Sequence, residues 1–280
     1  MLDLLCFMGL IDALRSRASH LGRLTRDLTR EVADSGHTAV YLRQLLRGNW
    51  GDRGEMASER ESHLAATDRP ARAPTPPVLL IHGYMATRGS LHLLERQLAR
   101  RGHVVMSYPL GPINLGDIRD SAGLIARKVE SMVAQTGVQK VDIVGHSMGG
   151  LVGLYYLKRL GGRHRVRRLL LLGTPTRGTW SALLGLITAP LGLASLQLLP
   201  GSPFLRELTE GPLPPGAEVI SIGAERDWLA PLSTTVLRGV RHLALPTGHS
   251  GLLVEADVAE VVDGLLRESG PRVDEPSAAT

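Results

Sequence analysis

The sequence contains few of the residues on which several classes of protein depend. It has one cysteine, Cys6, so no disulfide can form within the chain, and a zinc site built from clustered cysteines is excluded. Aromatic residues make up 4% of the chain, which disfavours nucleic-acid binding by base stacking. The net charge is +5, but 27 acidic residues are interspersed with 32 basic ones, and no long basic run occurs. The composition therefore favours a solvated mixed surface without a nucleic-acid partner, and it leaves contact with an anionic membrane surface open.

Two apolar stretches lack the features of a membrane span. The N-terminal stretch MLDLLCFMGLIDALRSR is too short to cross a bilayer, and Asp3 stands where a signal peptide needs positive charge. Residues 178–205 contain no charged residue, but Pro190 and Pro200 interrupt them, and they lie between two predicted strands of one sheet. We therefore expect a cytoplasmic or peripheral membrane protein with neither a signal peptide nor a transmembrane helix.

Hydrophobic periodicity and local composition divide the chain into four parts. Residues 1–48 are predicted to be a helical N-terminal extension, because leucines recur at intervals of seven with arginines on the other face. We expect this extension to pack on the main domain; a coiled-coil-like arm and a membrane-surface helix are the alternatives. Residues 49–77 are polar, rich in glycine and proline, and predicted to be a linker. Residues 78–269 form the main domain, and residues 270–280 are predicted to be a disordered tail.

The main domain alternates short apolar runs with longer amphipathic stretches. The runs predict strands at 77–83, 103–109, 140–145, 166–173, 217–223 and 240–246, and the longer stretches predict helices at 90–102, 116–137, 147–162 and 251–269. This alternation predicts an α/β fold with a mostly parallel sheet and helices on both faces. Ligands bind at the carboxyl ends of the strands in such sheets, so functional residues should directly follow strands. Residues from about 177 to 216 interrupt the alternation and are predicted to form an apolar cap over these strand ends.

A nucleophile is predicted at Ser147. The sequence Gly145-His146-Ser147-Met148-Gly149 fits G-x-S-x-G, directly follows a predicted strand and directly precedes a predicted helix. This strand–turn–helix setting is the one that a nucleophile elbow requires, with the serine in a strained conformation. Gly145 and Gly149 are expected because a Cβ atom at either position would clash across the tight bend. The stretch lacks the G-x-G-x-x-G pattern of dinucleotide-binding turns.

The serine needs a base, and the base needs a carboxylate to orient it. His249 follows a predicted strand at its carboxyl end, whereas His164 lies at the opposite end of a strand and His242 lies within one. We therefore predict His249 as the base. Asp227 and Glu225 both follow the strand at 217–223, and we prefer Asp227 because apolar residues adjoin it.

Two backbone N–H groups are predicted to stabilise the oxyanion. The strand at 77–83 ends in His82-Gly83-Tyr84, which places the Tyr84 N–H at the same edge of the sheet as the Met148 N–H. The helix that starts at the nucleophile directs its N-terminal N–H groups toward the same charge. His82 is expected to shape the loop without taking part in the reaction.

These stretches together resemble the α/β-hydrolase superfamily, and within it bacterial lipases and esterases. From Val78 to Leu266 the matching stretches are LLIHGYMATRGSL, VDIVGHSMGGLVGLYYLKRLGG, LLLLGTPTRGT, LPGSPFLREL, ERDWLAP and TGHSGLL, in the expected order. In such lipases the third stretch often reads GTPHRG, so Thr176 stands here in place of a histidine that is outside the triad.

The resemblance implies hydrolysis of lipid or acyl esters through an acyl-serine intermediate, without a metal or cofactor. Ser147 would attack, His249 would transfer the proton, Asp227 would orient His249, and the Tyr84 and Met148 N–H groups would hold the oxyanion. An acyltransferase or thioesterase with the same triad is the alternative, because pocket shape decides between water and another acceptor. A non-catalytic, membrane-anchored binding protein is a third hypothesis. Whether the cap opens at an oil–water interface is left open by the sequence.

Overall fold

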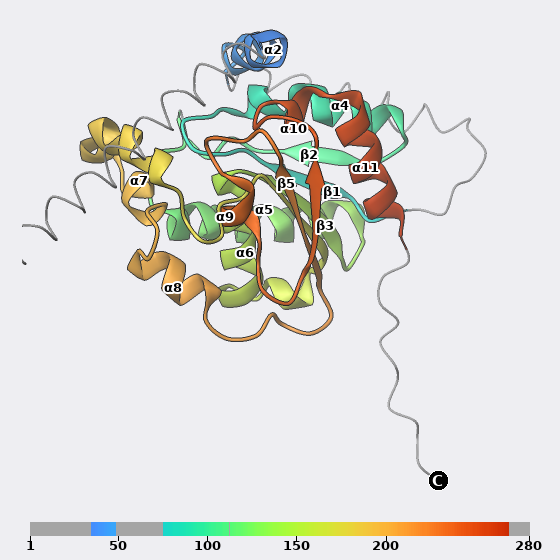
Figure 1. The fold of residues 1–280 in the computed structure, drawn as a ribbon. Helices are drawn as coiled ribbons and strands as arrows, with labels where there is room; N and C mark the ends of the chain where they lie inside the picture. Colours follow the sequence, from blue (N-terminus) through green and yellow to red (C-terminus); the bar gives the residue numbers. More distant parts are fainter. Residues whose placement is uncertain (1–34, 49–74, 112, 269–280) are drawn as a thin grey trace, which may run out of the picture.

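A computed structural model describes residues 35–48, 75–111 and 113–268 (Figure 1). Its centre is a six-stranded sheet in which every neighbouring pair of strands is parallel. The strand order is β2-β1-β3-β4-β5-β6. The strands are β1 (Val78–Ile81), β2 (Val105–Ser107), β3 (Val141–His146), β4 (Val166–Leu172), β5 (Glu218–Ala224) and β6 (Arg241–Leu245). The α/β fold with a parallel sheet that the sequence predicts is therefore confirmed. Predictions for residues 1–34, 49–74 and 270–280 lie outside the described residues.

Helices cover both faces of the sheet, on opposite sides of the strands in Figure 1. On one face, α5 (Ile118–Thr136) and α6 (Met148–Arg159) form a core with alternate strand residues such as Leu79 and Ile81. On the other face, α4 (His92–Arg100) and α11 (Ala256–Arg267) pack with the intervening residues, such as Val78 and Leu80. Successive side chains of a strand point to opposite faces of the sheet, so a continuous run of apolar residues contributes to both cores. Such a strand is stable only where helices cover both faces.

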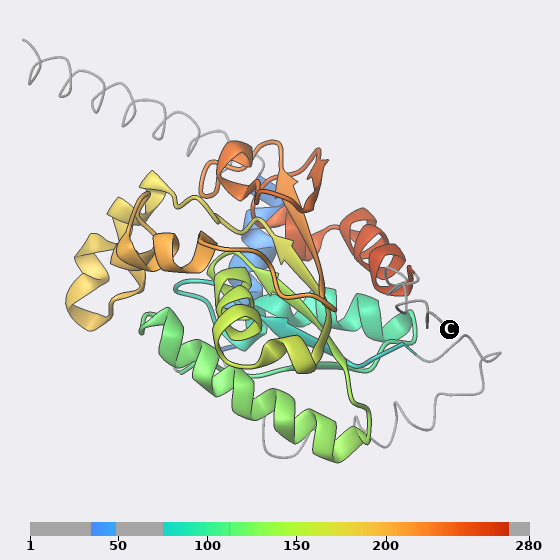
Figure 2. The ribbon, with the colours of Figure 1, turned by 90° about the horizontal axis from the view of Figure 1, so that it is seen from below.

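The segment from 178 to 205 folds as a cap, seen on the left of Figure 2. It contains η3 (Trp180–Leu191), α7 (Ala194–Gln197) and the start of α8 (Pro203–Thr209). The Gln197 side chain fastens the cap to the start of α5: its Oε1 accepts from the Ile118 N–H at 2.8 Å, and its Nε2 donates to Asp117 at 2.7 Å. In the parts of the chain described above, no helix is long and apolar enough to cross a membrane.

The C-terminal part of the domain differs from the sequence prediction. A single helix was expected over 251–269, but α10 (Gly251–Val254) and α11 are separated at Glu255, whose backbone is extended. The Glu255 carboxylate accepts a hydrogen bond from Thr247 at 2.5 Å and lies 3.2 Å from His37 Nδ1. These contacts are tertiary, and no glycine or proline marks the break, so the local sequence carries no signal of it.

The helix α2 (Ser35–Leu45) packs against α10 and against η1 (Arg88–Leu91). The Gln44 Oε1 accepts from the Leu93 N–H at 3.0 Å, and the Leu45 carbonyl accepts from the Thr87 hydroxyl at 3.1 Å. The Gly48 carbonyl accepts from the Gly89 N–H at 3.1 Å. Residues 35–48 are thus held to the main domain by backbone groups as well as by side chains.

Candidate active site

Ser147 occupies a strained turn between β3 and α6. Its φ of 54° and ψ of −127° lie outside the regions that L-residues ordinarily adopt. Its backbone N–H donates to the Leu172 carbonyl at 2.8 Å, which ties the turn to the end of β4. The side chain is therefore displayed at the carboxyl edge of the sheet, as the strand–turn–helix pattern predicts.

Three glycines allow the elbow to form. A methyl group at Gly145 would lie 2.5 Å from the Gly150 Cα, so the expected clash across the bend is present there. A methyl group at Gly149 would instead meet β1, at 2.7 Å from the His82 carbonyl oxygen. The reason expected for Gly149 is thus wrong: this glycine lets α6 approach the neighbouring strand. Gly150 was not predicted to matter, yet a methyl group there would lie 2.9 Å from the Thr174 Cβ.

Asp227 and His249 form a buried pair. The His249 Nδ1 lies 2.6 Å from the Asp227 Oδ2, and both residues are 6% exposed. The other carboxylate oxygen of Asp227 accepts from the Ala230 N–H at 2.7 Å, which fixes the carboxylate plane. Because Nδ1 donates to the carboxylate, Nε2 is left as the nitrogen that can accept a proton. Glu225 is exposed.

The other two histidines that the sequence offers lie elsewhere. His164 is exposed in η2 (Gly162–His164), before β4 begins, and its Nε2 accepts from the Arg163 side chain. His242 lies within the edge strand β6, and neither of its ring nitrogens has a hydrogen-bond partner among the described residues. Their positions agree with the choice of His249.

The backbone around the pair connects it to Ser147. A methyl group at Gly173, the residue after β4, would lie 3.2 Å from the His249 Nδ1 and 3.3 Å from the Asp227 Oδ2. The carbonyl of the preceding residue, Leu172, accepts the hydrogen bond from the Ser147 N–H. Gly173 therefore brings the end of β4 against the histidine–aspartate pair on one side and the elbow on the other. Gly173 was not predicted from the sequence, because its role depends on contacts made by residues distant in the chain.

His146 supports His249 from beneath. The two rings lie 4.6 Å apart between centroids, and the His146 Nε2 donates to the His249 backbone carbonyl at 3.2 Å. Burial holds the pKa of His146 well below its usual value, and the neighbouring His249 lowers it further. A neutral imidazole with its proton on Nε2 satisfies this geometry, so His146 positions the loop of His249.

The turn after β1 passes directly against the nucleophile. A methyl group at Gly83 would lie 2.9 Å from the Ser147 Cβ and 3.5 Å from its Oγ. Tyr84 follows Gly83 and Met148 follows Ser147, so both predicted oxyanion donors lie within one residue of this contact. Met148 is the first residue of α6, where a backbone N–H has no acceptor within the helix. The Tyr84 hydroxyl donates to the Gly185 carbonyl at 3.3 Å, which places the cap over this turn.

His82 fixes the turn from the buried side. Its Nε2 accepts from the Leu110 N–H at 3.3 Å, and its Nδ1 donates to the Gly83 carbonyl at 3.3 Å. Both bonds require a neutral ring with the proton on Nδ1. Burial accordingly lowers the pKa of His82 to about 4. His82 shapes the loop in the way the sequence analysis expected.

Acid should destabilise the protein through His82. Its pKa is 6.5 when exposed and about 4 in the fold, so the unfolded chain binds more protons between these pH values. The contribution of the neutral ring is fully present above pH 6.5 and is lost as the pH falls toward 4, a difference of about 3 kcal/mol. Urea unfolding between pH 7 and pH 4.5 measures this loss. His82→Gln should show a shallower decline than wild type, whereas exposed His164→Gln should follow wild type; equal slopes in all three proteins would contradict the assignment.

In the described part of the chain, no three His, Cys, Asp or Glu side chains are grouped so that they could hold a metal ion.

Comparisons with known proteins concern the fold. A family model described as the alpha/beta hydrolase fold matches residues 76–189. Lipase BlEst2 from Bacillus licheniformis, in its propeptide form, superposes with a TM-score of 0.62 and 19% identity over 72% of this chain and 52% of its own. The mature form gives a TM-score of 0.59 at 19% identity over 71% and 96%. Lipase B from Aspergillus fumigatus gives 0.60 at 19% identity over 74% and 56%. This chain thus spans about half the length of the propeptide form and of the fungal lipase.

The matched segment runs from the start of β1, through the elbow, into the cap. At 19% identity the likeness to the lipases is one of fold. The strand order, the serine turn after β3 and the family match lead to one conclusion: this chain has the α/β-hydrolase fold.

Proposed function

We propose that this protein is a serine carboxylester hydrolase that cleaves lipid or other acyl esters through an acyl-serine intermediate. The observation that carries the proposal is the 2.6 Å hydrogen bond between Asp227 and His249, buried against the backbone that holds Ser147. A buried histidine oriented by a carboxylate next to a strained serine can activate a hydroxyl group that is otherwise a weak nucleophile.

In the first half-reaction, the Ser147 Oγ attacks the ester carbonyl carbon while the His249 Nε2 accepts the hydroxyl proton. The carbonyl oxygen becomes an oxyanion, which the Tyr84 and Met148 N–H groups stabilise. The tetrahedral intermediate collapses, the bond to the alkoxy oxygen breaks, and His249 returns its proton to the leaving alcohol. Asp227 stabilises the imidazolium that exists between these steps.

In the second half-reaction, a water molecule attacks the acyl-serine carbonyl and gives its proton to His249. The second tetrahedral intermediate forms at the same two N–H groups. Its collapse releases the carboxylic acid and returns the proton to the Ser147 Oγ. The balance of the reaction is ester plus water giving acid plus alcohol, and no cofactor takes part.

The surface of the cap supports an apolar acyl group as substrate. Five large apolar side chains of the cap are exposed: Trp180, Leu183, Leu184, Leu193 and Leu196. Single exposed apolar residues are common, but a group of this kind within one segment marks a surface that binds something apolar. The Tyr84–Gly185 hydrogen bond places this segment next to the proposed oxyanion donors. We therefore propose esters with medium or long acyl chains, presented by a lipid aggregate or a membrane surface.

Hydrolysis of p-nitrophenyl esters of graded chain length tests this substrate class. We expect kcat/KM to rise from acetyl to octanoyl, because each buried methylene contributes about 0.8 kcal/mol. Trp180→Ser with Leu184→Ser should reduce the octanoyl-to-acetyl ratio about tenfold. Leu160→Ser, at an exposed leucine after the end of α6, is the matched control and should leave the ratio unchanged.

Two outcomes would count against these statements. A preference for acetyl over octanoyl esters would make the protein an esterase of short acyl groups. Absence of turnover at every chain length, together with no labelling of Ser147 by a fluorophosphonate, would overturn the hydrolase proposal itself.

A further inference from the structure

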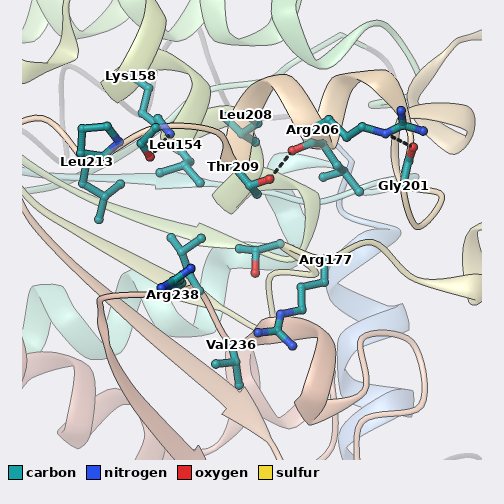
Figure 3. Close-up of a pocket in the computed structure, with 15 residues that line it drawn as sticks. Leu154, Lys158, Arg177, Gly201, Arg206, Leu208, Thr209, Leu213, Val236 and Arg238 are labelled. Atoms are coloured by element: carbon teal, nitrogen blue, oxygen red, sulfur yellow. Dashed lines mark hydrogen bonds between the residues drawn. The ribbon is translucent and has the colours of Figure 1, made fainter.

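A groove of about 520 Å³ lies along α6, between α8 and the residues that follow α9 (Leu232–Thr235) (Figure 3). This volume is in the range of sites that bind small molecules. Ser147, Asp227 and His249 are not among the residues that line it. Lys158, which does line it, is eleven residues after Ser147 in α6, a distance of about 16 Å along the helix axis. The groove is therefore separate from the candidate active site.

The charged side chains of this groove are all basic. They are Lys158, Arg177, Arg206 and Arg238, and no aspartate or glutamate lines the groove. Figure 3 shows Lys158 and Arg206 on one wall, with Arg177 and Arg238 on the opposite wall. Four cations around one concave surface raise the local concentration of anions, because low-dielectric walls focus the field.

Two of these cations are already fixed in place by neutral groups. The Lys158 Nζ donates to the Glu210 carbonyl at 2.7 Å, and the Arg206 Nε donates to the Gly201 carbonyl at 2.9 Å. Carbonyl oxygens orient these side chains without neutralising them. Burial lowers the pKa of Lys158, and neighbouring Arg159 lowers it further. Both effects disfavour the charged ammonium group, so a bound anion would offset the free energy that is needed to keep it charged.

The other two cations are not paired with acids. Across the described part of the chain, no acidic side chain forms an ion pair with Arg177 or Arg238, and both side chains are exposed. A guanidinium group presents several donors in one plane, which matches the oxygens of a phosphate or carboxylate. The two arginines come from segments that are joined through the backbone near α9, where the Arg177 N–H donates to the Thr234 carbonyl at 3.0 Å.

Between the cations the groove has an apolar part. Leu213, Val236 and Leu237 line it and are partly exposed, whereas Leu154, Leu205 and Leu208, which also adjoin it, are buried. A small inorganic anion would leave this apolar surface uncovered. An anion attached to a hydrocarbon chain would satisfy both parts, with the charged group at the arginines and the chain along Leu213, Val236 and Leu237.

We propose that this groove binds an anionic amphiphile, a phosphate or carboxylate group joined to an apolar chain, at a site separate from the catalytic serine. Arg177 and Arg238 hold the anionic group, and Lys158 and Arg206 add to the positive field. The assignment does not depend on the reaction that Ser147 carries out.

Calorimetric titration with single-chain probes tests the assignment. Decyl phosphate and decanoate, each below its aggregation concentration, distinguish a phosphate from a carboxylate headgroup; decanol lacks the charge, and inorganic phosphate lacks the chain. We expect at least one of the two charged amphiphiles to bind at least about tenfold more tightly than decanol and inorganic phosphate, since charge-assisted hydrogen bonds and chain burial both contribute. Equal affinity for decanol, or no binding of either charged amphiphile, would overturn the proposal.

Paired variants locate the binding. Arg177→Gln with Arg238→Gln should weaken binding about tenfold or more, and binding should weaken as salt is added. Arg43→Gln with Arg96→Gln removes the same charge from exposed positions on α2 and α4, and should bind as wild type does. If both pairs weaken binding equally, the effect is one of net charge and the site is refuted.

A chemical readout separates this groove from the active site. The bound amphiphile should protect Arg177 and Arg238 from modification by phenylglyoxal, as mapped by peptide mass spectrometry. Protection should persist in Ser147→Ala, which lacks the nucleophile. Binding without protection of these two arginines would place the ligand elsewhere and overturn the assignment, whether or not the protein hydrolyses esters.

Discussion

Replacing Ser147 by alanine should abolish ester hydrolysis, with a loss in kcat of about 10⁶-fold, the size seen when the nucleophile of a serine protease is removed. The substitution deletes only the Oγ atom, so the elbow backbone and the hydrogen bond from the Ser147 N–H to Leu172 can be retained. Single-turnover kinetics with p-nitrophenyl octanoate would measure the loss. Fluorophosphonate labelling should disappear with it.

Ser250 supplies the matched control, because Gly248-His249-Ser250 repeats the tripeptide Gly145-His146-Ser147. Ser250 follows His249 at the N-terminus of α10, and its side chain makes no capping hydrogen bond. Its neighbour on the chain is the proposed base, so Ser250→Ala perturbs the same region without removing the proposed nucleophile. We expect kcat to change less than about twofold. A large loss in Ser250→Ala with activity retained in Ser147→Ala would reverse the assignment of the two serines.

Asp227→Asn should lower kcat by about 10⁴-fold, the effect of the corresponding change in a serine protease. The asparagine can keep the acceptor that receives the Ala230 N–H, so the loop should stay folded. Its amide group cannot accept the His249 Nδ1 proton as the Asp227 Oδ2 does, and the ring would lose the tautomer in which Nε2 can accept a proton. The same assay, with a thermal melt to verify folding, would test this.

Glu225→Gln is the control for that substitution. Glu225 is exposed two residues earlier in the same turn, and it was the alternative carboxylate in the sequence. We expect Glu225→Gln to retain wild-type kcat. A normal rate in Asp227→Asn together with a large loss in Glu225→Gln would transfer the orienting role to Glu225.

The alternation of apolar runs and amphipathic stretches was sufficient to predict the parallel sheet and the layers of helices. These features follow from periodicity, which is local. The same holds for the position of Ser147, because the strand before it, the glycines around it and the helix after it are all written within a few residues. Asp227 and His249 could be chosen because the edge of a parallel sheet limits where functional side chains can lie.

The remaining features could not be predicted, because each depends on contacts between distant segments. The sequence does not distinguish Gly173 from other glycines in turns, because its role depends on the close approach of Asp227 and His249. The sequence around His146 shows only that it lies in the elbow, whereas its hydrogen bond to the His249 carbonyl is visible only in the structure. The break at Glu255 follows from its contacts with Thr247 and His37, which lie outside the helical pattern. The basic groove draws its four cations from separate segments, none of which is a basic run.

The packing of α2 on the main domain determines which residues a stably folded fragment of this protein must contain. A fragment that begins at Val78 would retain the six described strands and the loops of Asp227 and His249, but it would lack one side of a packed interface. It would lose the acceptors of the Leu93 and Gly89 N–H groups and the His37 partner of Glu255. The cooperative unit therefore includes residues 35–48, although the family match begins only at residue 76.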